Sequence, residues 1–414
     1  MEILVVILII VGSARLGGEL MERLSLPGLL GELLVGVLLG FLLLTVPGKT
    51  IEILKIQEDP FFRGLLDVAI FFLMFMAGLE IRLRDVVQAS RVGIPVAIGG
   101  VVFPLLLGIW VGWIFIPPSQ YKFAQCLFLG VALSITAIPV SVRALMDLGH
   151  LRSRVGTAII NAAVIDDIIG IVLLGFLTTF LSVGSVPSAS SALLMLGRPV
   201  LFFGIAVPVA LYVVPFIDQR LPSAKSAELH FTVGICFGLA MAILSELLGL
   251  HFMIGAFVAG LLLSEWTIQS KAILEHMKEK VGGVTLGFLA PIFFVSIGLH
   301  LDLSAFREAL WFTISLLAVA IAGKVLGSGL LAKLAGVTWR ESFAIGIGMN
   351  GRGAVELVVA SVALEAGLFT QPVPPHPVVS AMFSAVVIVA IITTLMTPLG
   401  LRALLLPPEV QKDT

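Results

Sequence analysis

Long apolar runs recur along the whole chain, and they constrain its fold more than any other feature. A helix needs about 20 apolar residues to cross a bilayer, and thirteen segments come near that length, the ninth being the shortest. Their approximate bounds are residues 3–24, 27–44, 65–83, 92–116, 123–148, 155–181, 200–216, 229–248, 252–263, 281–299, 309–331, 342–364 and 378–399. In lipid every backbone amide needs a partner within the protein. We therefore predict an all-α polytopic membrane protein with about thirteen transmembrane helices.

Composition agrees with lipid as the solvent. Of the 414 residues 59% are hydrophobic and 12% are charged, with a mean hydropathy of +1.13. A soluble fold leaves too much surface in water for a chain this apolar. The formal net charge of −1 and the absence of long runs of one sign argue against a nucleic-acid partner. Cys126 and Cys236 have no CxxC spacing, so we expect neither a resident metal nor any other cofactor.

The basic residues in the connections predict the orientation of the chain. Most of them lie in the odd-numbered connections and at the C-terminus, and Lys and Arg accumulate on the cytoplasmic side. The N-terminus is therefore expected outside the cell (inner) membrane and the C-terminus in the cytoplasm. The transmembrane domain is expected at residues 1–404, followed by a short cytoplasmic tail at 405–414. Lys324 and Arg352 are the two basic residues that we assign to the interior of a span rather than to a connection.

The chain contains an internal repeat. The run Leu26–Leu39 parallels Leu250–Leu263, and Phe75–Glu80 parallels Val295–His300. Seven expected spans separate the starts of the two copies, and an odd number inverts the second copy in the membrane. Inverted repeats are typical of secondary transporters. We expect two inverted five-helix repeats with crossing broken helices, at about 26–182 and 250–402.

Two adjacent carboxylates, Asp166 and Asp167, lie in the middle of the sixth apolar segment. About 18 Å of helix separates Val155 from Asp167, which places the pair near the bilayer centre. Each carboxylate there costs on the order of 3 kcal/mol to insert, so the pattern favours function over accident. Neighbours on a helix point about 100° apart, so one carboxylate can pair with a cation while the other binds an ion.

Lys324 lies equally deep in the eleventh segment. A buried ammonium needs a counter-charge or loses its proton, and the aspartate pair is the acidic cluster at comparable depth. Snorkelling to the interface is the alternative, which the distance to either end of the segment disfavours. We predict that Lys324 compensates the charge of the aspartate pair.

The fifth and twelfth segments are interrupted at corresponding positions of the two repeats. The fifth carries Ser134, Thr136 and Pro139, and the twelfth carries the glycine-rich run Gly346–Gly353. Two interrupted helices near the midplane indicate an ion site. A buried Lys or Arg would offset the carbonyl ends exposed there.

Arg352 and Glu356 lie four residues apart on one face of the interrupted twelfth segment. This spacing predicts an ion pair, and we interpret it as structural rather than as a direct contact with the transported ion.

These blocks together resemble the monovalent cation:proton antiporter superfamily, second branch, and within it the bacterial sodium/proton antiporters. The resemblance covers almost the whole chain and rests on Pro27–Gly40, Phe75–Glu80, Thr136 with Val142 and Arg143, Ala163–Asp167, Gly255–Glu265, Pro291–Phe294, Gly323–Gly327 and Arg352–Gly353. It implies that Asp167 binds the transported Na⁺ and carries the proton, while Asp166 pairs with Lys324. Thr136 would line the site, with Ser134 and Asn161 as further lining candidates.

The resemblance also implies the activity and the assembly. We expect exchange of Na⁺ or Li⁺ for H⁺ by alternating access, with both ions competing for Asp167. We expect a six-helix core and a panel of helices through which two copies form a homodimer in membrane lipid. We do not expect an enzymatic reaction. Many relatives have Arg-Gly-Glu where Glu356 here follows Arg352 by four residues, so K⁺/H⁺ exchange on the same scaffold stays an alternative.

Two other classes of protein fit the sequence less well. An intramembrane aspartyl protease needs two buried aspartates that share one proton, and such a dyad converges from separate chain positions, unlike Asp166 and Asp167. A sodium-coupled solute symporter has similar repeats, but the buried Lys324 would oppose a positively charged coupling site.

Overall fold

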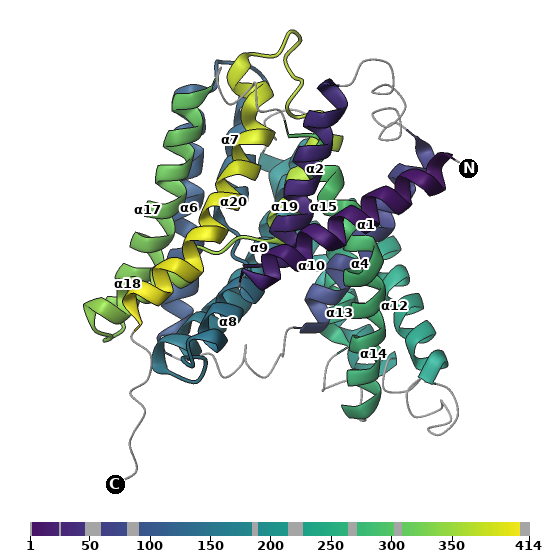
Figure 1. Ribbon diagram of the computed structural model, residues 1–414, viewed down its shortest axis with the longest axis horizontal. Coiled ribbons are helices and arrows are strands. Elements are labelled where there is room, and N and C mark those ends of the chain that lie inside the picture. Colours follow the sequence, from purple (N-terminus) through teal and green to yellow (C-terminus); the bar gives the residue numbers. More distant parts are fainter. Residues whose placement is uncertain are drawn as a thin grey trace. The chain divides into compact units, whose positions relative to one another are not determined.

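The computed structural model describes residues 2–24, 26–45, 59–80, 91–183, 189–213, 227–263, 271–301 and 309–405. Every regular element within these ranges is a helix, which confirms the all-α prediction (Figure 1). The expected tail at 405–414 lies outside the described residues apart from Leu405.

The chain divides into two compact units, each built from two separate stretches. Unit 1 comprises Met1–Leu83 and Pro187–Leu301, and unit 2 comprises Arg84–Val186 and Asp302–Thr414. The helices described in unit 1 are α1 (Glu2–Arg23), α2 (Gly28–Thr45), α4 (Pro60–Glu80), α10 (Ala189–Pro208), the π-helical η2 (Val209–Val213), α12 (Ala227–Leu247), α13 (Phe252–Leu262), α14 (Lys271–Val284), the π-helical η3 (Thr285–Leu289) and α15 (Ala290–Leu299). Those described in unit 2 are α6 (Gly93–Phe115), α7 (Lys122–Ser134), α8 (Ile138–Asp147), α9 (Arg154–Val183), α17 (Leu310–Leu334), α18 (Trp339–Gly348), α19 (Ala354–Glu365) and α20 (Pro377–Leu404).

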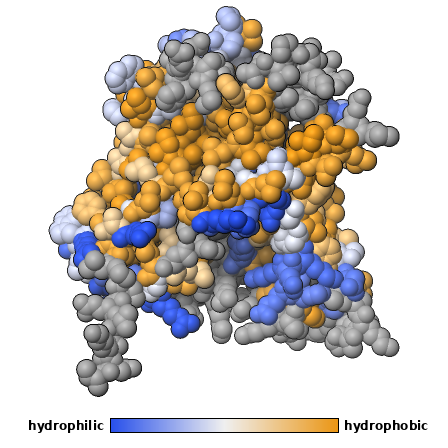
Figure 2. Space-filling view, viewed as in Figure 1, coloured by the Kyte–Doolittle hydropathy of each residue, from blue (hydrophilic) through white to orange (hydrophobic). Residues whose placement is uncertain are grey.

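Eight of the described helices are long and apolar enough to cross a membrane, and three shorter apolar helices accompany them. The interrupted segments are each divided between two shorter helices, α7 with α8 and α18 with α19. The count of thirteen spans therefore stays a prediction. Apolar side chains cover much of the visible face of the described residues in Figure 2, and Leu8, Trp110 and Trp311 are among the large hydrophobic residues that are exposed. Such a surface is that of a multi-pass membrane protein.

Two helices begin earlier than the apolar pattern predicted. The helix expected at 281–299 begins at Lys271, as α14, and continues through η3 into α15. The helix expected at 200–216 begins at Ala189, as α10. The sequence KAILEHMKEK at the start of α14 is charged, but Lys, Glu, Met and Ala are good helix formers. Hydropathy therefore marks where apolar surroundings begin and not where helical hydrogen bonding begins.

Corresponding glycines of the two repeats make reciprocal contacts within unit 1. A Cβ on Gly36 of α2 would lie 2.9 Å from the Cα of Gly298 on α15, and one on Gly260 of α13 would lie 3.1 Å from the carbonyl carbon of Gly78 on α4. In the repeat Gly36 corresponds to Gly260, and Gly78 corresponds to Gly298. The contact of Gly36 with Gly298 and the contact of Gly260 with Gly78 therefore join the same two positions of the repeat, with the first and second copies interchanged.

Glycines also bring α6 and α17 together in unit 2, where the two helices run side by side (Figure 1). A Cβ on Gly327 would lie 2.8 Å from the carbonyl carbon of Gly99, and one on Gly323 would lie 2.9 Å from the Cα of Pro104. Small residues allow such close approach between helices in a membrane. This approach fixes the position of Lys324, which lies between the two glycines of α17.

A capping box starts α18. Thr338 Oγ1 accepts from the amide of Glu341 at 3.3 Å, and the amide of Thr338 donates to Glu341 Oε2 at 2.8 Å. The bond from the Thr338 backbone holds the pKa of Glu341 below its usual range. These reciprocal bonds satisfy two amides at the start of the helix and fix where the chain enters the twelfth segment.

We expect Gly327→Ala to destabilise the protein by about 1–3 kcal/mol, because the added methyl group meets the backbone of Gly99 and neither helix can yield locally. The melting temperature of the purified protein in detergent measures this. Gly204→Ala is the matched control, since a Cβ at that position of α10 meets nothing within 4 Å. Equal melting temperatures for the two variants would contradict the close packing of α6 and α17.

Candidate functional site

The fifth and twelfth segments are both interrupted in unit 2, as predicted. α7 ends at Ser134 and α8 begins at Ile138, and Ile135 between them is extended, with φ −74° and ψ 140°. α18 ends at Gly348 and α19 begins at Ala354. Pro139 lies in the first turn of α8, where its missing amide hydrogen costs no intrahelical bond.

The two interruptions contact each other through hydrogen bonds. The amide of Ala137 donates to the carbonyl oxygen of Gly351 at 2.8 Å. Thr136 Oγ1 donates to the carbonyl oxygen of Met349 at 3.1 Å. The non-helical stretches of the two repeats therefore form one crossing, at which freed backbone groups find partners.

Lys324 of α17 reaches this crossing and is fully buried. Its Nζ donates to Asp166 Oδ2 at 3.2 Å, to Thr136 Oγ1 at 2.5 Å and to the carbonyl oxygen of Ser134. Asp166, on α9, is 1% exposed. The structure thus brings together the ammonium and the carboxylate that the sequence suggested as partners.

Arg352 follows the interruption in the second repeat and is also buried. Its Nη1 donates to Glu356 Oε1 at 2.9 Å, so the predicted pair is present. The same Nη1 donates to the carbonyl oxygen of Ala132 at 2.8 Å, and Nη2 donates to that of Leu133 at 2.8 Å. Arg352 therefore binds α7 as well as its own helix.

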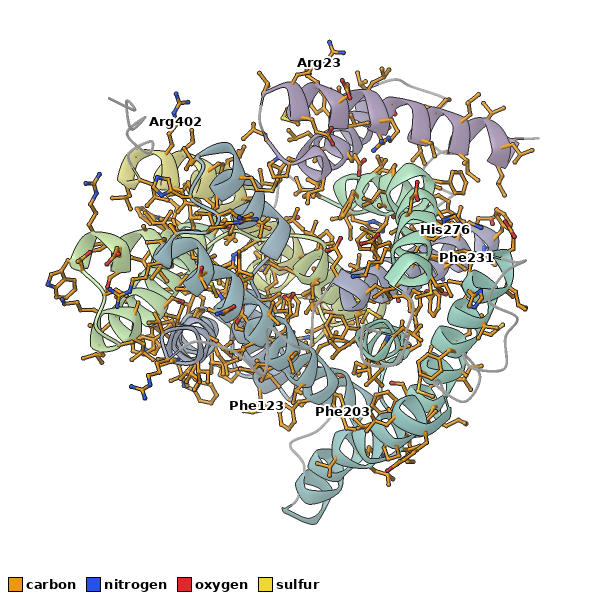
Figure 3. The ribbon with its side chains drawn as sticks, turned by 90° about the horizontal axis from the view of Figure 1, so that it is seen from below. Arg23, Phe123, Phe203, Phe231, His276 and Arg402 are labelled. Atoms are coloured by element: carbon orange, nitrogen blue, oxygen red, sulfur yellow. The ribbon has the colours of Figure 1, made fainter. Side chains whose placement is uncertain are left out.

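The C-terminal end of α7 consequently holds two cations. Its last three carbonyls, those of Ala132, Leu133 and Ser134, accept hydrogen bonds from Arg352 or Lys324. A helix C-terminus carries unsatisfied carbonyls and a partial negative charge. The two cations donate hydrogen bonds to these carbonyls and offset that charge. Other basic residues behave differently: Figure 3 shows the labelled arginines near the ends of α1 and α20, Arg23 and Arg402, pointing away from the ribbon.

Asp167 is the second buried carboxylate, with 9% of its surface exposed. It follows Asp166 on α9, and successive helical residues point about 100° apart.

The side chains of two other predicted lining residues, Ser134 and Asn161, make no hydrogen bond to the crossing in the described part of the chain. The Ser134 hydroxyl donates back to the carbonyl oxygen of Val131 at 2.7 Å, so Ser134 contributes its backbone. No hydrogen bond joins Asn161, also on α9, to the described residues of the crossing.

Two further residues hold the crossing and were not singled out from the sequence. Ser141 Oγ donates to the carbonyl oxygen of Gly348. Thr394 of α20 accepts from the amide of Arg352 at 3.2 Å and donates to its carbonyl oxygen at 2.8 Å. Thr394 could have been predicted as a contact residue because it is a hydroxyl residue within an apolar segment, and polar groups inside a span need partners.

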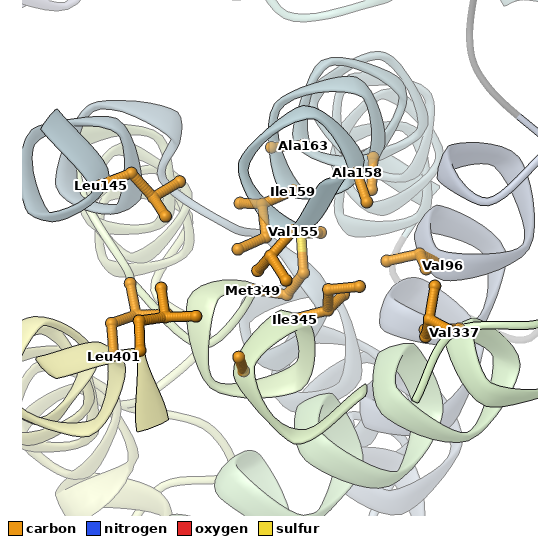
Figure 4. Packing of buried hydrophobic residues seen from close by; sticks show 14 of the residues in the cluster. Val96, Leu145, Val155, Ala158, Ile159, Ala163, Val337, Ile345, Met349 and Leu401 are labelled. Atoms are coloured by element: carbon orange, nitrogen blue, oxygen red, sulfur yellow. The ribbon is translucent and has the colours of Figure 1, made fainter. Parts of the chain in front are cut away.

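An apolar cluster packs the interruption between α18 and α19 against α9. Met349 lies beside Val155 and Ile159 in Figure 4. Ile345 of α18 and Leu401 of α20 belong to the same cluster. This packing fixes the crossing relative to the helix that carries the two aspartates.

The family model described as sodium/hydrogen exchanger, transmembrane, matches residues 5–406. Over 392 residues the chain is 31% identical to the Na(+)/H(+)-K(+) antiporter GerN of Bacillus cereus, covering 95% of this chain and 93% of that protein. It is 30% identical over 404 residues to a Na(+)/H(+) antiporter of Enterococcus hirae, covering 97% and 98%.

A solved structure shares the fold. The sodium proton antiporter MjNhaP1 of Methanocaldococcus jannaschii superposes with a TM-score of 0.69 at 17% identity, covering 97% of this chain and 96% of that one. At this identity the likeness concerns the architecture.

We expect Arg352→Gln to destabilise the protein by about 3–5 kcal/mol, because it leaves the buried carboxylate of Glu356 without its cation. The double variant with Glu356→Gln should lose less than the sum of the single losses, since the uncompensated charge is gone. Unfolding of the purified protein measures both, with the exposed Arg402→Gln as control. Strict additivity would contradict the pairing.

Proposed function

This chain belongs to the sodium/hydrogen exchanger family, and from that premise we propose that it exchanges Na⁺ or Li⁺ for H⁺, with both ions competing for Asp167. The observation that carries this proposal is the difference between the two aspartates. Asp166 lies 3.2 Å from Lys324 Nζ in a fully buried pair, whereas Asp167 keeps 9% of its surface exposed. The more accessible carboxylate is the one that exchanges its ligand.

Competition at a single carboxylate couples the two ions. Asp167 binds a metal ion only when ionised, so a bound proton excludes Na⁺, and bound Na⁺ lowers the carboxyl affinity for a proton. The buried Lys324 and Arg352 offset the charge of the neighbouring carboxylates and of the α7 C-terminus. No covalent intermediate or cofactor is needed, so the protein acts as a transporter and not as an enzyme.

Access alternates when one unit moves relative to the other, which presents Asp167 first to one side of the membrane and then to the opposite side. We assign the protein to the cell (inner) membrane, with the N-terminus outside and the C-terminus in the cytoplasm. The basic connections of the sequence support this orientation. A homodimer is the expected assembly.

K⁺/H⁺ exchange is the second candidate, and a specific observation favours it. The relative from Bacillus cereus that is 31% identical is named for K⁺ as well as for Na⁺ and H⁺. Collapse of a preset pH gradient in proteoliposomes, compared for Na⁺, Li⁺ and K⁺, separates the two candidates. Gradient collapse by K⁺ alone would replace sodium exchange with potassium exchange.

Asp167→Asn should abolish exchange of every cation while the protein stays folded, because the amide keeps the volume of the side chain but cannot titrate. The pH-gradient assay measures the loss, and the melting temperature checks the fold. Asp67→Asn removes an exposed carboxylate of α4 in unit 1 and serves as the control that keeps exchange. Transport at the normal rate by Asp167→Asn would refute the assignment.

Apparent sodium affinity should fall as pH falls, because protonation of Asp167 removes the ligand. Below the pKa of the empty site each pH unit weakens binding by up to about tenfold, or about 1.4 kcal/mol, for each displaced proton. Isothermal titration of the purified protein with NaCl across the acidic to alkaline range measures this. A flat profile would mean that another residue carries the proton.

A further inference from the structure

Most backbone oxygens of the second interruption already hold a proton donor. The carbonyl oxygen of Gly348 accepts from Ser141 Oγ. The carbonyl of Met349 accepts from Thr136, and that of Gly351 accepts from the Ala137 amide. Broken helices in transporters commonly offer such carbonyls to the transported cation, but here they hold the crossing together.

The carbonyls at the end of α7 are unsuitable ligands for a different reason. Those of Ala132, Leu133 and Ser134 accept from Arg352 or Lys324. A cation that approached these oxygens would come close to a buried guanidinium or ammonium, and like charges repel strongly at short range in a low-dielectric interior. These bonds favour side-chain oxygens as ligands of the transported cation.

Asn350 offers such an oxygen. Its side chain is buried, with 3% of the residue exposed, and its Oδ1 has no hydrogen-bond partner among the described residues. The residues on either side of it, Met349 and Gly351, are bonded to Thr136 and Ala137, so Asn350 belongs to the crossing. Burying an amide oxygen without a partner is unfavourable, and a bound cation would satisfy it.

Other buried oxygens in the described part of the chain also lack a hydrogen-bond partner, among them Asp166 Oδ1, whose carboxylate pairs with Lys324, and Glu356 Oε2. The other oxygen of the Glu356 carboxylate lies 2.9 Å from the Arg352 guanidinium, so a cation bound there would again meet a fixed positive charge. This difference favours the neutral side chain as the ligand.

We propose that Asn350 is a specificity-determining ligand of the transported cation, its amide oxygen coordinating the ion that binds at Asp167. The inference rests on the proposed function and deepens it. Asp167 supplies the charge and titrates, whereas Asn350 supplies a neutral oxygen that does not. The bonded peptides on both sides of Asn350 fix the backbone that carries this side chain, which favours discrimination among cations by size.

Asn350→Ala tests the inference in proteoliposomes, with the KM for Na⁺, Li⁺ and K⁺ each read from cation-induced collapse of a preset pH gradient. We expect the KM for the preferred cation to rise about tenfold, as the loss of one polar contact predicts, and the ratios among the three cations to change. Asn350→Ser keeps an oxygen and should restore part of the affinity. Asn350→Asp adds a carboxylate and should make cation affinity more dependent on pH.

Ser328→Ala is the matched control, because Ser328 is a buried residue one turn from Lys324 whose hydroxyl bonds to the carbonyl oxygen of Val96 at 3.2 Å. It should leave all three KM values unchanged. Unchanged KM values in Asn350→Ala, or an equal rise for all three cations, would overturn the inference. If Asn350→Ala fails to fold, the cation ratios of Asn350→Ser decide in the same way. If Asp167→Asn abolishes exchange while Asn350→Ala leaves the KM values unchanged, the role of Asn350 is wrong but the proposed function stands. If Asp167→Asn still exchanges cations, the proposed function itself is wrong.

Discussion

The capped C-terminal end of α7 is the constraint on which the rest of unit 2 depends. A half-helix that stops inside an apolar protein leaves carbonyls without partners, and here Lys324 and Arg352 supply the missing donors. Buried cations need counter-charges in turn, which Asp166 and Glu356 provide. Each of these four buried charges thus has a physical reason that leads back to an interrupted helix.

The sum of these charges has a consequence for ion binding. Asp166 and Glu356 balance Lys324 and Arg352, and Asp167 adds a third carboxylate. With these three carboxylates and two cations ionised, the crossing carries a formal charge of −1. One proton or one monovalent cation neutralises it. In the proposed exchange, the pairs that stabilise the broken helices therefore leave one negative charge that either ion can neutralise.

Much of this site could be predicted from the sequence because charge is expensive at the bilayer centre. That cost limits the partners of Lys324 to the aspartate pair, and spacing alone indicates the pair of Arg352 with Glu356. The sequence also predicted that a buried Lys or Arg would offset the carbonyl ends of the interrupted helices. Which carbonyls Arg352 binds could not be predicted, because backbone carbonyls have no sequence signature. For the same reason the sequence indicated Ser134 as a lining residue but not that it contributes its carbonyl oxygen. The bounds of α14 escaped prediction because its charged first turns continue a helix that apolar periodicity does not reveal.

The glycine contacts bear on how access to Asp167 can change. Between α6 and α17 the backbones of Gly99 and Gly327 are too close for a side chain, and such contacts resist sliding because any shift brings side chains against backbone. Hydrogen bonds between the interruptions add a second restraint. Repacking within unit 2 would break both sets of contacts, whereas moving the unit as a body keeps them. In the proposed alternating access, the least costly change therefore keeps the crossing, its cations and its carboxylates together.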